Sequence, residues 1–369
     1  MKASGVELNA ISPYFTMFPL DFPIRIIEEY SSPGDLVLDP FCGRGTTNFA
    51  ARLLGRKTYG IDCNPMAVAV SRAKMVSPAV EEIVSEAKRI LHSREKLCSI
   101  PSGDFWDSAF NPDVLTAIVK IRNDLLDSCR SDARIALRAI MLGALHGPVN
   151  KGKPSYFSNQ SPRTYAPKPD YAYRYWRTHG LSAPNVDVIE IIKDRAVRYY
   201  CNRIHAIPYT ITQGDSRKKT PFTRLISQGG ADLIVTSPPY PGMVSYYTDQ
   251  WLRNWFMGGS PGIDYNSNSG LKSLNKEIFI SDLRAVWHQA AYSSKPKAVL
   301  VCRFGVLPSF KGEKDSILLT SFQGTPWKVV SAQSAGTAKM GKRVAETQMG
   351  KKVTPANEEI DVVCEKYLI

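Results

Sequence analysis

Residues 35–47 read DLVLDPFCGRGTT, a short apolar run that ends in an acid and leads into a loop with two glycines. The following stretch, TTNFAARLLG, has the apolar spacing of a helix that Gly55 can end. A second apolar run, KTYGID, ends at Asp62. A strand, a loop, a helix and a second strand in this order are the unit of a parallel sheet. The stretch therefore predicts an α/β fold.

The rest of the chain continues this pattern after a long interruption. Helical periodicity dominates residues 79–147 and returns over 187–200. Further strands are predicted at 208–213, 232–236, 297–304, 327–333 and 360–366. A helix before the strand at 297 is predicted to begin at Ser281 as its N-cap. The strands therefore form two groups, which a largely helical insertion separates.

Composition narrows the class of protein. The 369 residues are 43% hydrophobic and carry a formal net charge of +13, which suggests a polyanionic partner such as nucleic acid. A basic surface without a special purpose is the alternative. No stretch approaches a membrane span, and the N-terminus lacks the apolar core of a signal peptide, so we expect a cytoplasmic protein. The seven cysteines are scattered and form no CxxC pair, so no metal site is expected.

The loop after the first strand has the features of a nucleoside site. Gly43 and Gly45 allow a ligand to approach the backbone, and the following helix start offers free N–H groups. The loop lacks the Gly-Lys-Ser/Thr of a phosphate-binding P-loop, and it does not match GxGxxG. About twenty residues later, Asp62 ends a strand, where a carboxylate can bind ribose hydroxyls. The alternative is a tight turn followed by a capped strand.

Residues 232–242, DLIVTSPPYPG, form the second informative stretch. Two consecutive prolines cannot continue a strand, because they lack backbone donors. Ser237 and the rigid carbonyls at Pro238 and Pro239 can accept hydrogen bonds from an amine, and Tyr240 can stack on a flat ring. Ligands of parallel sheets gather at the carboxyl ends of the strands, so this segment should meet the glycine loop there. A proline-rich strand end with a packed tyrosine is the alternative.

The motifs VLDPFCGRGTT and TSPPY, in this order, resemble those of S-adenosylmethionine-dependent DNA amino-methyltransferases. Four further stretches are similar to family segments: MFPLDFPIRIIEEYSSPGD before the loop, GIDCNP, QGDSRK and, after TSPPY, YPGMVSYYTDQWLRNWFMG. Together these matches cover about a third of the chain. The resemblance implies a Rossmann-like, seven-stranded, mostly parallel methyltransferase sheet with a largely helical insertion. It implies a cofactor half at 1–75, an insertion for target recognition at 76–205 and a catalytic half at 206–369.

The resemblance also implies roles for individual residues. S-adenosyl-L-methionine would be held by Asp39, Phe41, Gly43, Gly45, Thr46, Asp62 and Asp215, with Asp62 on the ribose and Asp215 on the adenine amine. The catalytic residues would be Ser237, Pro238, Pro239 and Tyr240. Ser237 and the Pro238 carbonyl would accept hydrogen bonds from the target amine, and Tyr240 would stack on a base flipped out of double-stranded DNA. A cognate restriction endonuclease is a further expected partner.

Direct transfer to an amine fits these residues. Two acceptors out of the ring plane make the amine nitrogen pyramidal, and positioning supplies much of the barrier reduction. Methylation at cytosine C5 needs a cysteine nucleophile, which that family carries in a Pro-Cys pair, and the chain has none. Within the amino-methyltransferases, Ser237 favours cytosine N4 over adenine N6. An adenine-N6 enzyme, an RNA methyltransferase and a non-catalytic nucleic-acid-binding module remain alternatives.

Residues 151–180 combine cations with aromatic rings, as nucleic-acid-binding segments do. The candidate cations are Lys151, Lys153, Arg163, Lys168, Arg174 and Arg177. The aromatic residues are Tyr156, Phe157, Tyr165, Tyr171, Tyr173, Tyr175 and Trp176. The alternative is a loop that packs on the protein through its rings. A second basic run at 339–352 is interpreted as a DNA-backbone arm or a surface loop.

Overall fold

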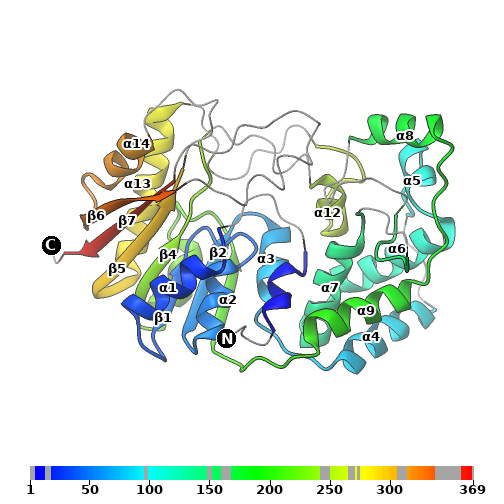
Figure 1. Cartoon of the computed structure of the whole chain (residues 1–369), viewed down its shortest axis with the longest axis horizontal. Coiled ribbons are helices and arrows are strands. Elements are labelled where there is room, and N and C mark those ends of the chain that lie inside the picture. Colours follow the sequence, from blue (N-terminus) through cyan, green and yellow to red (C-terminus); the bar gives the residue numbers. More distant parts are fainter. Residues whose placement is uncertain are drawn as a thin grey trace. The chain divides into compact units, whose positions relative to one another are not determined.

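The chain folds into two compact units, which are described separately here from a computed structural model (Figure 1). The structure describes residues 5–12, 18–94, 99–147, 152–158, 168–241, 250–264, 271, 275–305, 314–336 and 359–367. Unit 1 comprises Met1–Pro13, Val76–Ile204 and Ser245–Ser267. Unit 2 comprises Tyr14–Met75, His205–Val244 and Asn268–Ile369. The basic run at 339–352 lies outside the described residues.

Unit 2 is built on a seven-stranded sheet. Its strands are β1 (Leu36–Asp39), β2 (Lys57–Asp62), β3 (Tyr209–Gln213), β4 (Ala231–Thr236), β5 (Ser294–Phe304), β6 (Trp327–Gly336) and β7 (Glu359–Lys366). The strand order is β3-β2-β1-β4-β5-β7-β6. Neighbouring strands are parallel from β3 to β5, and β7 runs antiparallel to both β5 and β6. The predicted seven-stranded, mostly parallel Rossmann-like sheet is confirmed.

Alternation along the central strands creates two apolar layers. Val37 faces one layer, together with Leu233 and Val235, and packs on α1 (Asp21–Tyr30) and α2 (Thr46–Leu53). Leu38 faces the other, which includes side chains of α13 (Lys276–Tyr292) and α14 (Lys314–Phe322). Successive strand residues point to opposite faces, so burial on both sides explains the nearly continuous apolar runs.

Two helices of unit 2 begin at asparagines whose side chains cap them. Asn64 caps α3 (Pro65–Ala73) by accepting from the Met66 N–H at 3.0 Å. The short elements η2 (Thr220–Phe222) and α10 (Thr223–Ser227) follow β3. The predicted start of α13 at Ser281 was wrong. The side chain of Asn275 accepts from two backbone N–H groups, so the cap stands at position 275 instead of 281.

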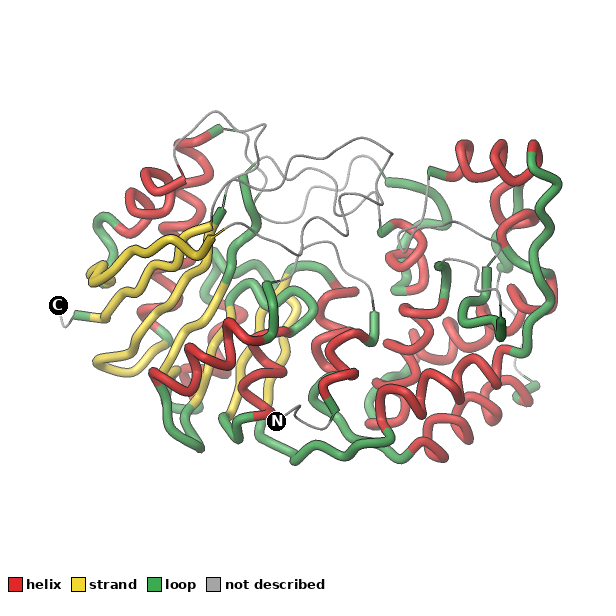
Figure 2. Tube along the Cα trace, in the orientation of Figure 1, coloured by secondary structure: helices red, strands yellow, loops and turns green. Residues whose placement is uncertain are grey.

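Unit 1 is helical, and Figure 2 shows it as helices and loops over its described part. Its elements are η1 (Val6–Ala10), α4 (Val80–His92), α5 (Asp104–Ala109), α6 (Pro112–Asp127), α7 (Asp132–Ala144), α8 (Pro169–Thr178), α9 (Val188–Tyr200) and α12 (Trp251–Phe256). Arg134 ties α7 to α4 and α6 through Glu86 and Asp124. Helix α8 was not predicted, because tyrosine and arginine at half of its positions hide the apolar period. No helix in the described part of the chain is long and apolar enough to cross a bilayer.

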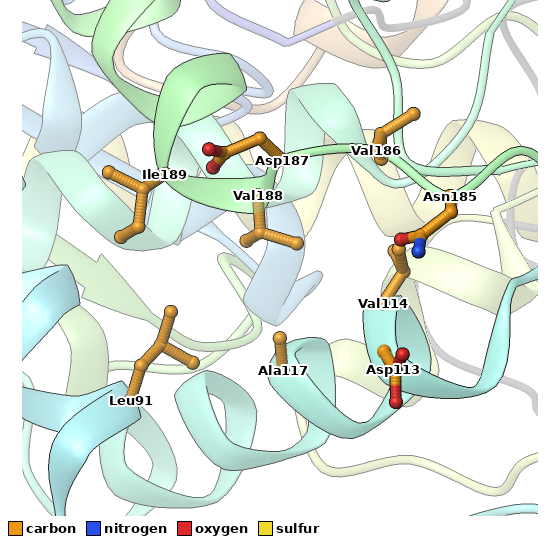
Figure 3. A pocket seen from close by; sticks show the side chains of 9 residues that line it. All are labelled: Leu91, Asp113, Val114, Ala117, Asn185, Val186, Asp187, Val188 and Ile189. Atoms are coloured by element: carbon orange, nitrogen blue, oxygen red, sulfur yellow. The ribbon is translucent and has the colours of Figure 1, made fainter.

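A shallow pocket of about 210 Å³ lies between helices of unit 1 (Figure 3). Figure 3 shows the side chains of Leu91, Ala117 and Val188 turned toward one another. Of its two acids, Asp113 and Asp187, the latter accepts from the Glu190 N–H at 3.0 Å and so caps α9. The pocket is therefore a packing feature at helix ends, and its geometry suggests no chemistry.

Candidate active site

The predicted cofactor and catalytic residues all belong to unit 2, at the carboxyl ends of β1 to β4. Register places these ends at one edge of the sheet, with Asp39 opposite Gly60 and Leu38 opposite Ile234. Asp62 ends β2, Asp215 follows β3 by two residues, and Ser237 follows β4 directly. Parallel pairing therefore brings these segments to one edge of unit 2, as the motif order predicts.

The glycine loop, residues 40–45, depends on backbone that glycine provides. Gly43 and Gly45 have φ angles of 50° and 75°, in the left-handed region. A Cβ on Gly45 would lie 2.2 Å from the Ser71 Oγ, so α3 approaches the loop too closely for any side chain. The first turn of α2 follows, and Thr46 at its start is buried. Within the loop, the N–H groups of Phe41, Cys42, Gly43 and Gly45 all donate to atoms of the protein, so the N–H groups that a ligand can use belong to the first turn of α2.

Asp62 holds the glycine loop in place through hydrogen bonds to its carboxylate. Its carboxylate accepts from the Gly43 N–H at 2.9 Å and from the Asn64 N–H at 2.8 Å. Burial raises the pKa of Asp62 to about 6, and these two donors oppose the shift. A carboxylate has about four acceptor positions, so lone pairs remain for ligand hydroxyls.

Asp39 joins the loop to β4. Its carboxylate accepts from the Thr236 hydroxyl at 2.7 Å and from the Phe41 N–H at 3.0 Å. The side chain is only 1% exposed, and burial raises its pKa to about 6. Thr236 precedes Ser237, so one buried carboxyl connects the glycine loop and the Ser-Pro-Pro-Tyr segment. Phe41 itself is partly buried and packs edge-on against Trp287 at 6.3 Å between ring centroids.

Asp215 is held by an arginine that the sequence analysis did not single out. The Arg217 guanidinium donates to both carboxylate oxygens, with a shortest distance of 2.8 Å. Its Nη1 donates to Asp282 of α13 at 3.0 Å. The Arg217 hydrogen bonds lower the pKa of Asp215, so the carboxylate stays ionised. The local sequence QGDSRK contains Arg217, but its pairing with Asp282 lies 65 residues away and leaves no local signal.

The Ser-Pro-Pro-Tyr segment leaves β4 with mixed exposure. Pro238 is buried, whereas Ser237, Pro239 and Tyr240 are partly exposed. The Tyr240 hydroxyl donates to Glu359 at 2.5 Å, and the ring packs edge-on against Phe304 at 5.8 Å between centroids. Ser237 thus offers a hydroxyl at the strand end, next to a rigid backbone without amide donors. Glu359 was missed by sequence reasoning, because nothing in its surroundings marks it.

These residues fit the amino-acid and nucleoside parts of S-adenosylmethionine. The left-handed glycines turn the chain into α2, whose first N–H groups suit a carboxylate. Asp62 and Asp215 are carboxylates able to accept from hydroxyl and amine donors. Among the described residues, no group of three or more potential metal ligands is found.

The six predicted nucleic-acid-binding residues divide into three groups. Lys151 and Arg163 lie outside the described residues. Lys153 forms ion pairs with Asp194 at 2.7 Å and Glu190 at 3.4 Å on α9. Lys168, Arg174 and Arg177 are exposed on or next to α8. Only this last group offers cations that no described acid neutralises by an ion pair.

The aromatic residues of this segment also divide. Phe157 and Trp176 are buried, and the Arg195 guanidinium lies 4.7 Å from the Tyr156 ring centroid. Tyr171 and Tyr175, by contrast, are 68% and 39% exposed, and their stacked ring centroids are 6.5 Å apart. Some aromatic residues of this segment are thus packed in the protein, and others are exposed to solvent. Tyr165 lies outside the described residues.

Comparison with known proteins agrees with the resemblance seen in the sequence. Residues 2–73 match the family model N6_N4_Mtase, described as DNA methylase. The type II methyltransferase M1.MboII of Moraxella bovis is 46% identical over 65 residues, which are 17% of this chain and 24% of the relative. M.EcaI of Enterobacter cloacae is 62% identical over 37 residues, covering 10% of this chain and 8% of the relative. The chain thus matches less than a quarter of the length of these two relatives.

Two wider matches are more distant. The type II methyltransferase M.MvaI of Kocuria varians is 24% identical over 311 residues, which are 73% of this chain and 64% of the relative. The solved structure of the rRNA methyltransferase aviRa from Streptomyces viridochromogenes is 10% identical, covers 99% of this chain and 94% of that chain, and has a TM-score of 0.38. The DNA methylase match and the sheet indicate S-adenosylmethionine as the cofactor of unit 2.

Proposed function

We propose that the protein is a DNA methyltransferase that transfers a methyl group to the N4 amine of cytosine in double-stranded DNA. The observation that carries the proposal is the Asp39–Thr236 hydrogen bond of 2.7 Å, which joins the glycine loop to the strand that ends in Ser237. Cofactor motif and catalytic motif are thereby parts of one hydrogen-bonded edge of unit 2. The DNA methylase match over residues 2–73 supports DNA as the substrate.

The cofactor would be held by the residues that the motifs predicted. The glycine loop and the first turn of α2 would bind its amino-acid end, with N–H groups of that turn as donors, while Asp62 would bind its ribose hydroxyls and Asp215 its adenine amine. When bound, S-adenosylmethionine supplies an activated methyl group on a sulfonium. Arg217 would keep Asp215 ionised and oriented as an acceptor. Phe41, fixed against Trp287, would limit the room beside the loop.

The target amine would be activated by acceptors at the end of β4. The Ser237 hydroxyl and the Pro238 carbonyl would accept its two hydrogens, which draws the lone pair out of the ring plane. Pro238 and Pro239 contribute no backbone N–H that could compete for these acceptors. Tyr240 would stack on the extruded base. As positive charge develops on the nitrogen, acceptors already in place stabilise it without reorganising.

Cytosine is proposed over adenine because Ser237 stands at the first position of the catalytic motif. The family model spans both N6 and N4 enzymes in its name, so it supports the amine chemistry and leaves the base to experiment. A cognate restriction endonuclease is proposed as the functional partner, in keeping with the type II relatives.

Helix α8 is proposed as part of the DNA contact surface. Tyr171, Arg174, Tyr175 and Thr178 have i, i+3, i+4, i+7 spacing, so they share one face, and all four are exposed. We call these four residues the α8 face. The opposite face is buried through Ala172 and Trp176, whose ring lies 5.6 Å from Phe105 of α5. Arginine, tyrosine and threonine are side chains that contact DNA phosphates.

The experiment that tests the function uses full-length protein, isotope-labelled S-adenosylmethionine and unmethylated duplex DNA of mixed sequence. Digestion to nucleosides and mass spectrometry should show N4-methylcytosine. Ser237→Ala should lower the rate by about 100-fold or more while DNA binding persists, since one preorganised group is lost. Ser227→Ala, an exposed serine of α10, is the matched control.

Other outcomes of this experiment have distinct meanings. N6-methyladenine would overturn the choice of cytosine and leave the amine chemistry standing. Label on RNA alone, in a parallel reaction, would overturn DNA as the substrate. Binding of DNA and cofactor without transfer to any base would overturn the enzyme in favour of a binding module.

A further inference from the structure

The proposed base-stacking residue, Tyr240, is surrounded by three residues from outside the catalytic motif. Its hydroxyl donates to the Glu359 Oε1 at 2.5 Å. Its ring packs against Phe304, the last residue of β5. A Cβ built on Gly305, the next residue, would lie 3.1 Å from Tyr240 Cε2 and Cζ and 3.3 Å from Glu359 Cγ. The ring, the carboxylate and this glycine are therefore in close mutual contact.

Sheet pairing explains why Glu359 reaches this position. Glu359 is the first residue of β7, and the next residue, Ile360, pairs with Phe304 at the end of β5. Strand β7 runs antiparallel to β5, so its beginning meets the carboxyl end of β5. An acid at the start of β7 thus arrives at the edge where the catalytic segment leaves β4.

We propose that Glu359 is a positioning residue for Tyr240, acting on the ring that stacks on the target base; this rests on the function proposed above. A hydrogen bond to a carboxylate is short and strong. It restricts rotation of the Tyr240 side chain about its Cα–Cβ and Cβ–Cγ bonds. Gly305 allows the ring to sit against the β5 end without a side chain in between. The ring is consequently ordered before a base arrives, which lowers the entropy lost on stacking.

The carboxylate also changes the electronic character of the ring. A phenol that donates to an anion is richer in electrons than a free phenol, and a ring rich in electrons attracts a cation at its face more strongly. The base gains positive charge during transfer of a methyl cation equivalent to its amine. Glu359 should therefore favour the transition state over the ground state, and its loss should lower kcat more than it raises KM for DNA.

A purely structural contact between the ends of β4 and β7 predicts something different. Its loss would lower stability, while the remaining folded enzyme would keep its kcat. The two possibilities separate in a comparison of Glu359→Ala, Glu359→Gln, Tyr240→Phe and the double variant Tyr240→Phe/Glu359→Ala. Glu365→Gln is the matched control, because Glu365 is an exposed acid on the same strand.

The test measures kcat, KM for DNA and the Kd for S-adenosylmethionine, with labelled methyl transfer as readout, at a temperature where every variant is folded by circular dichroism. Glu359→Ala and Tyr240→Phe should each lower kcat about tenfold, the size expected when a hydrogen bond to a charged group is lost. The double variant should be no slower than either single variant, because both remove the same bond. Glu359→Gln, which keeps an acceptor oxygen, should retain more activity, and cofactor affinity should not change.

A second variant tests the same contact from the other side. Gly305→Ala should displace the ring or the carboxylate and lower kcat with Glu359 still present. Wild-type kcat in Glu359→Ala, or additive losses in the double variant, would overturn the proposal while methyl transfer by the wild type upholds the enzyme. Absence of transfer by the wild type would overturn both.

Discussion

The glycine loop of unit 2 and the α8 face of unit 1 are two candidate binding regions of opposite construction. The loop is proposed to bind through backbone at a helix start, and its glycines are required by left-handed φ angles and, at Gly45, by a neighbour 2.2 Å from a hypothetical Cβ. The α8 face is proposed to bind through side chains that project from a regular helix with an exposed Tyr171. A backbone site restricts which residues can stand in it, whereas a helix face tolerates most of them. This difference predicts how sharply each region responds to substitution.

The largest effect is expected at Gly45. Gly45→Ala places a Cβ at 2.2 Å from the Ser71 Oγ and at a φ of 75°, so overpacking adds to left-handed strain. We expect a loss of about 3 kcal/mol in the free energy of unfolding and no measurable cofactor binding. Urea unfolding and isothermal titration calorimetry with S-adenosylmethionine measure the two quantities.

Gly34→Ala separates strain from crowding. Gly34 also has a positive φ, 90°, but no atom lies within 4 Å of the hypothetical Cβ. It should cost about 1–2 kcal/mol and leave cofactor binding intact. Equal losses in the two variants would mean that the close approach of α3 has no energetic importance for the loop.

The second prediction concerns pH and the carboxylate beneath the loop. Burial raises the pKa of Asp62 to about 6, so at acidic pH protonation removes its charge and one acceptor position and weakens its hydrogen bonds to hydroxyl donors. Cofactor affinity should therefore rise as pH increases through 6, and it should be about tenfold weaker at pH 5 than at pH 7.5. Titration calorimetry over this range gives the profile.

Two variants identify the residue that causes the pH dependence of cofactor affinity. Asp62→Asn should bind weakly at all pH values and show no inflection near pH 6. Asp39→Asn removes the other acid whose pKa burial raises to about 6, yet it should retain the inflection. Loss of the inflection only in Asp39→Asn would move the pH dependence from the ribose acid to the contact with Thr236.

How far the sequence predicts the structure differs between these regions for a physical reason. The strands around 35–62 and the sheet class were predictable from the sequence. Strands that are buried on both faces are nearly continuous apolar runs, and the turns between them contain glycines. The start of α13 and the existence of α8 were not. Asn275 and Ser281 are both residue types that cap helices, and the structure uses Asn275. The solvent-exposed residues of α8 include tyrosines as well as charged residues, so its apolar spacing is hidden.

Partners distant in sequence could not be predicted at all. Arg217 donates a hydrogen bond to Asp282, 65 positions later in the sequence. Tyr240 donates one to Glu359, 119 positions later. Such pairs depend on how helices and strands pack. Lys153 is the converse case, a cation in a promising segment that Asp194 neutralises. The assignment of residues to the glycine loop is therefore a stronger prediction than the assignment of cations to DNA.

The third prediction tests the arginine that holds Asp215. Arg217→Ala removes two donors from that carboxylate and the link to Asp282, so Asp215 can rotate away from the adenine amine. The pair is about one-third exposed, so solvent screening limits its strength, and we expect cofactor affinity to fall only about fivefold. Arg224→Ala, an exposed arginine of α10, is the control. Unchanged affinity would show that Asp215 needs no positioning.

The smallest effect is expected on the α8 face, and its signature is the salt dependence of DNA binding. Each phosphate contact adds about 0.9 to the slope of log K against log salt, which is roughly 3.5-fold in affinity between 50 and 200 mM. Arg174→Ala should lower the magnitude of the salt slope by about 0.9. Tyr171→Ala should weaken DNA binding and leave the slope unchanged. Fluorescence anisotropy with a labelled duplex measures both.

Lys153→Ala provides the contrast that decides between free and neutralised cations. Its ammonium lies 2.7 Å from Asp194, so it should release no counterions from DNA, and its removal should leave the slope unchanged. A slope lowered by Lys153→Ala and untouched by Arg174→Ala would reverse the assignment. The DNA surface of unit 1 would then lie near the start of α9, and the tyrosines of α8 would have no part in binding.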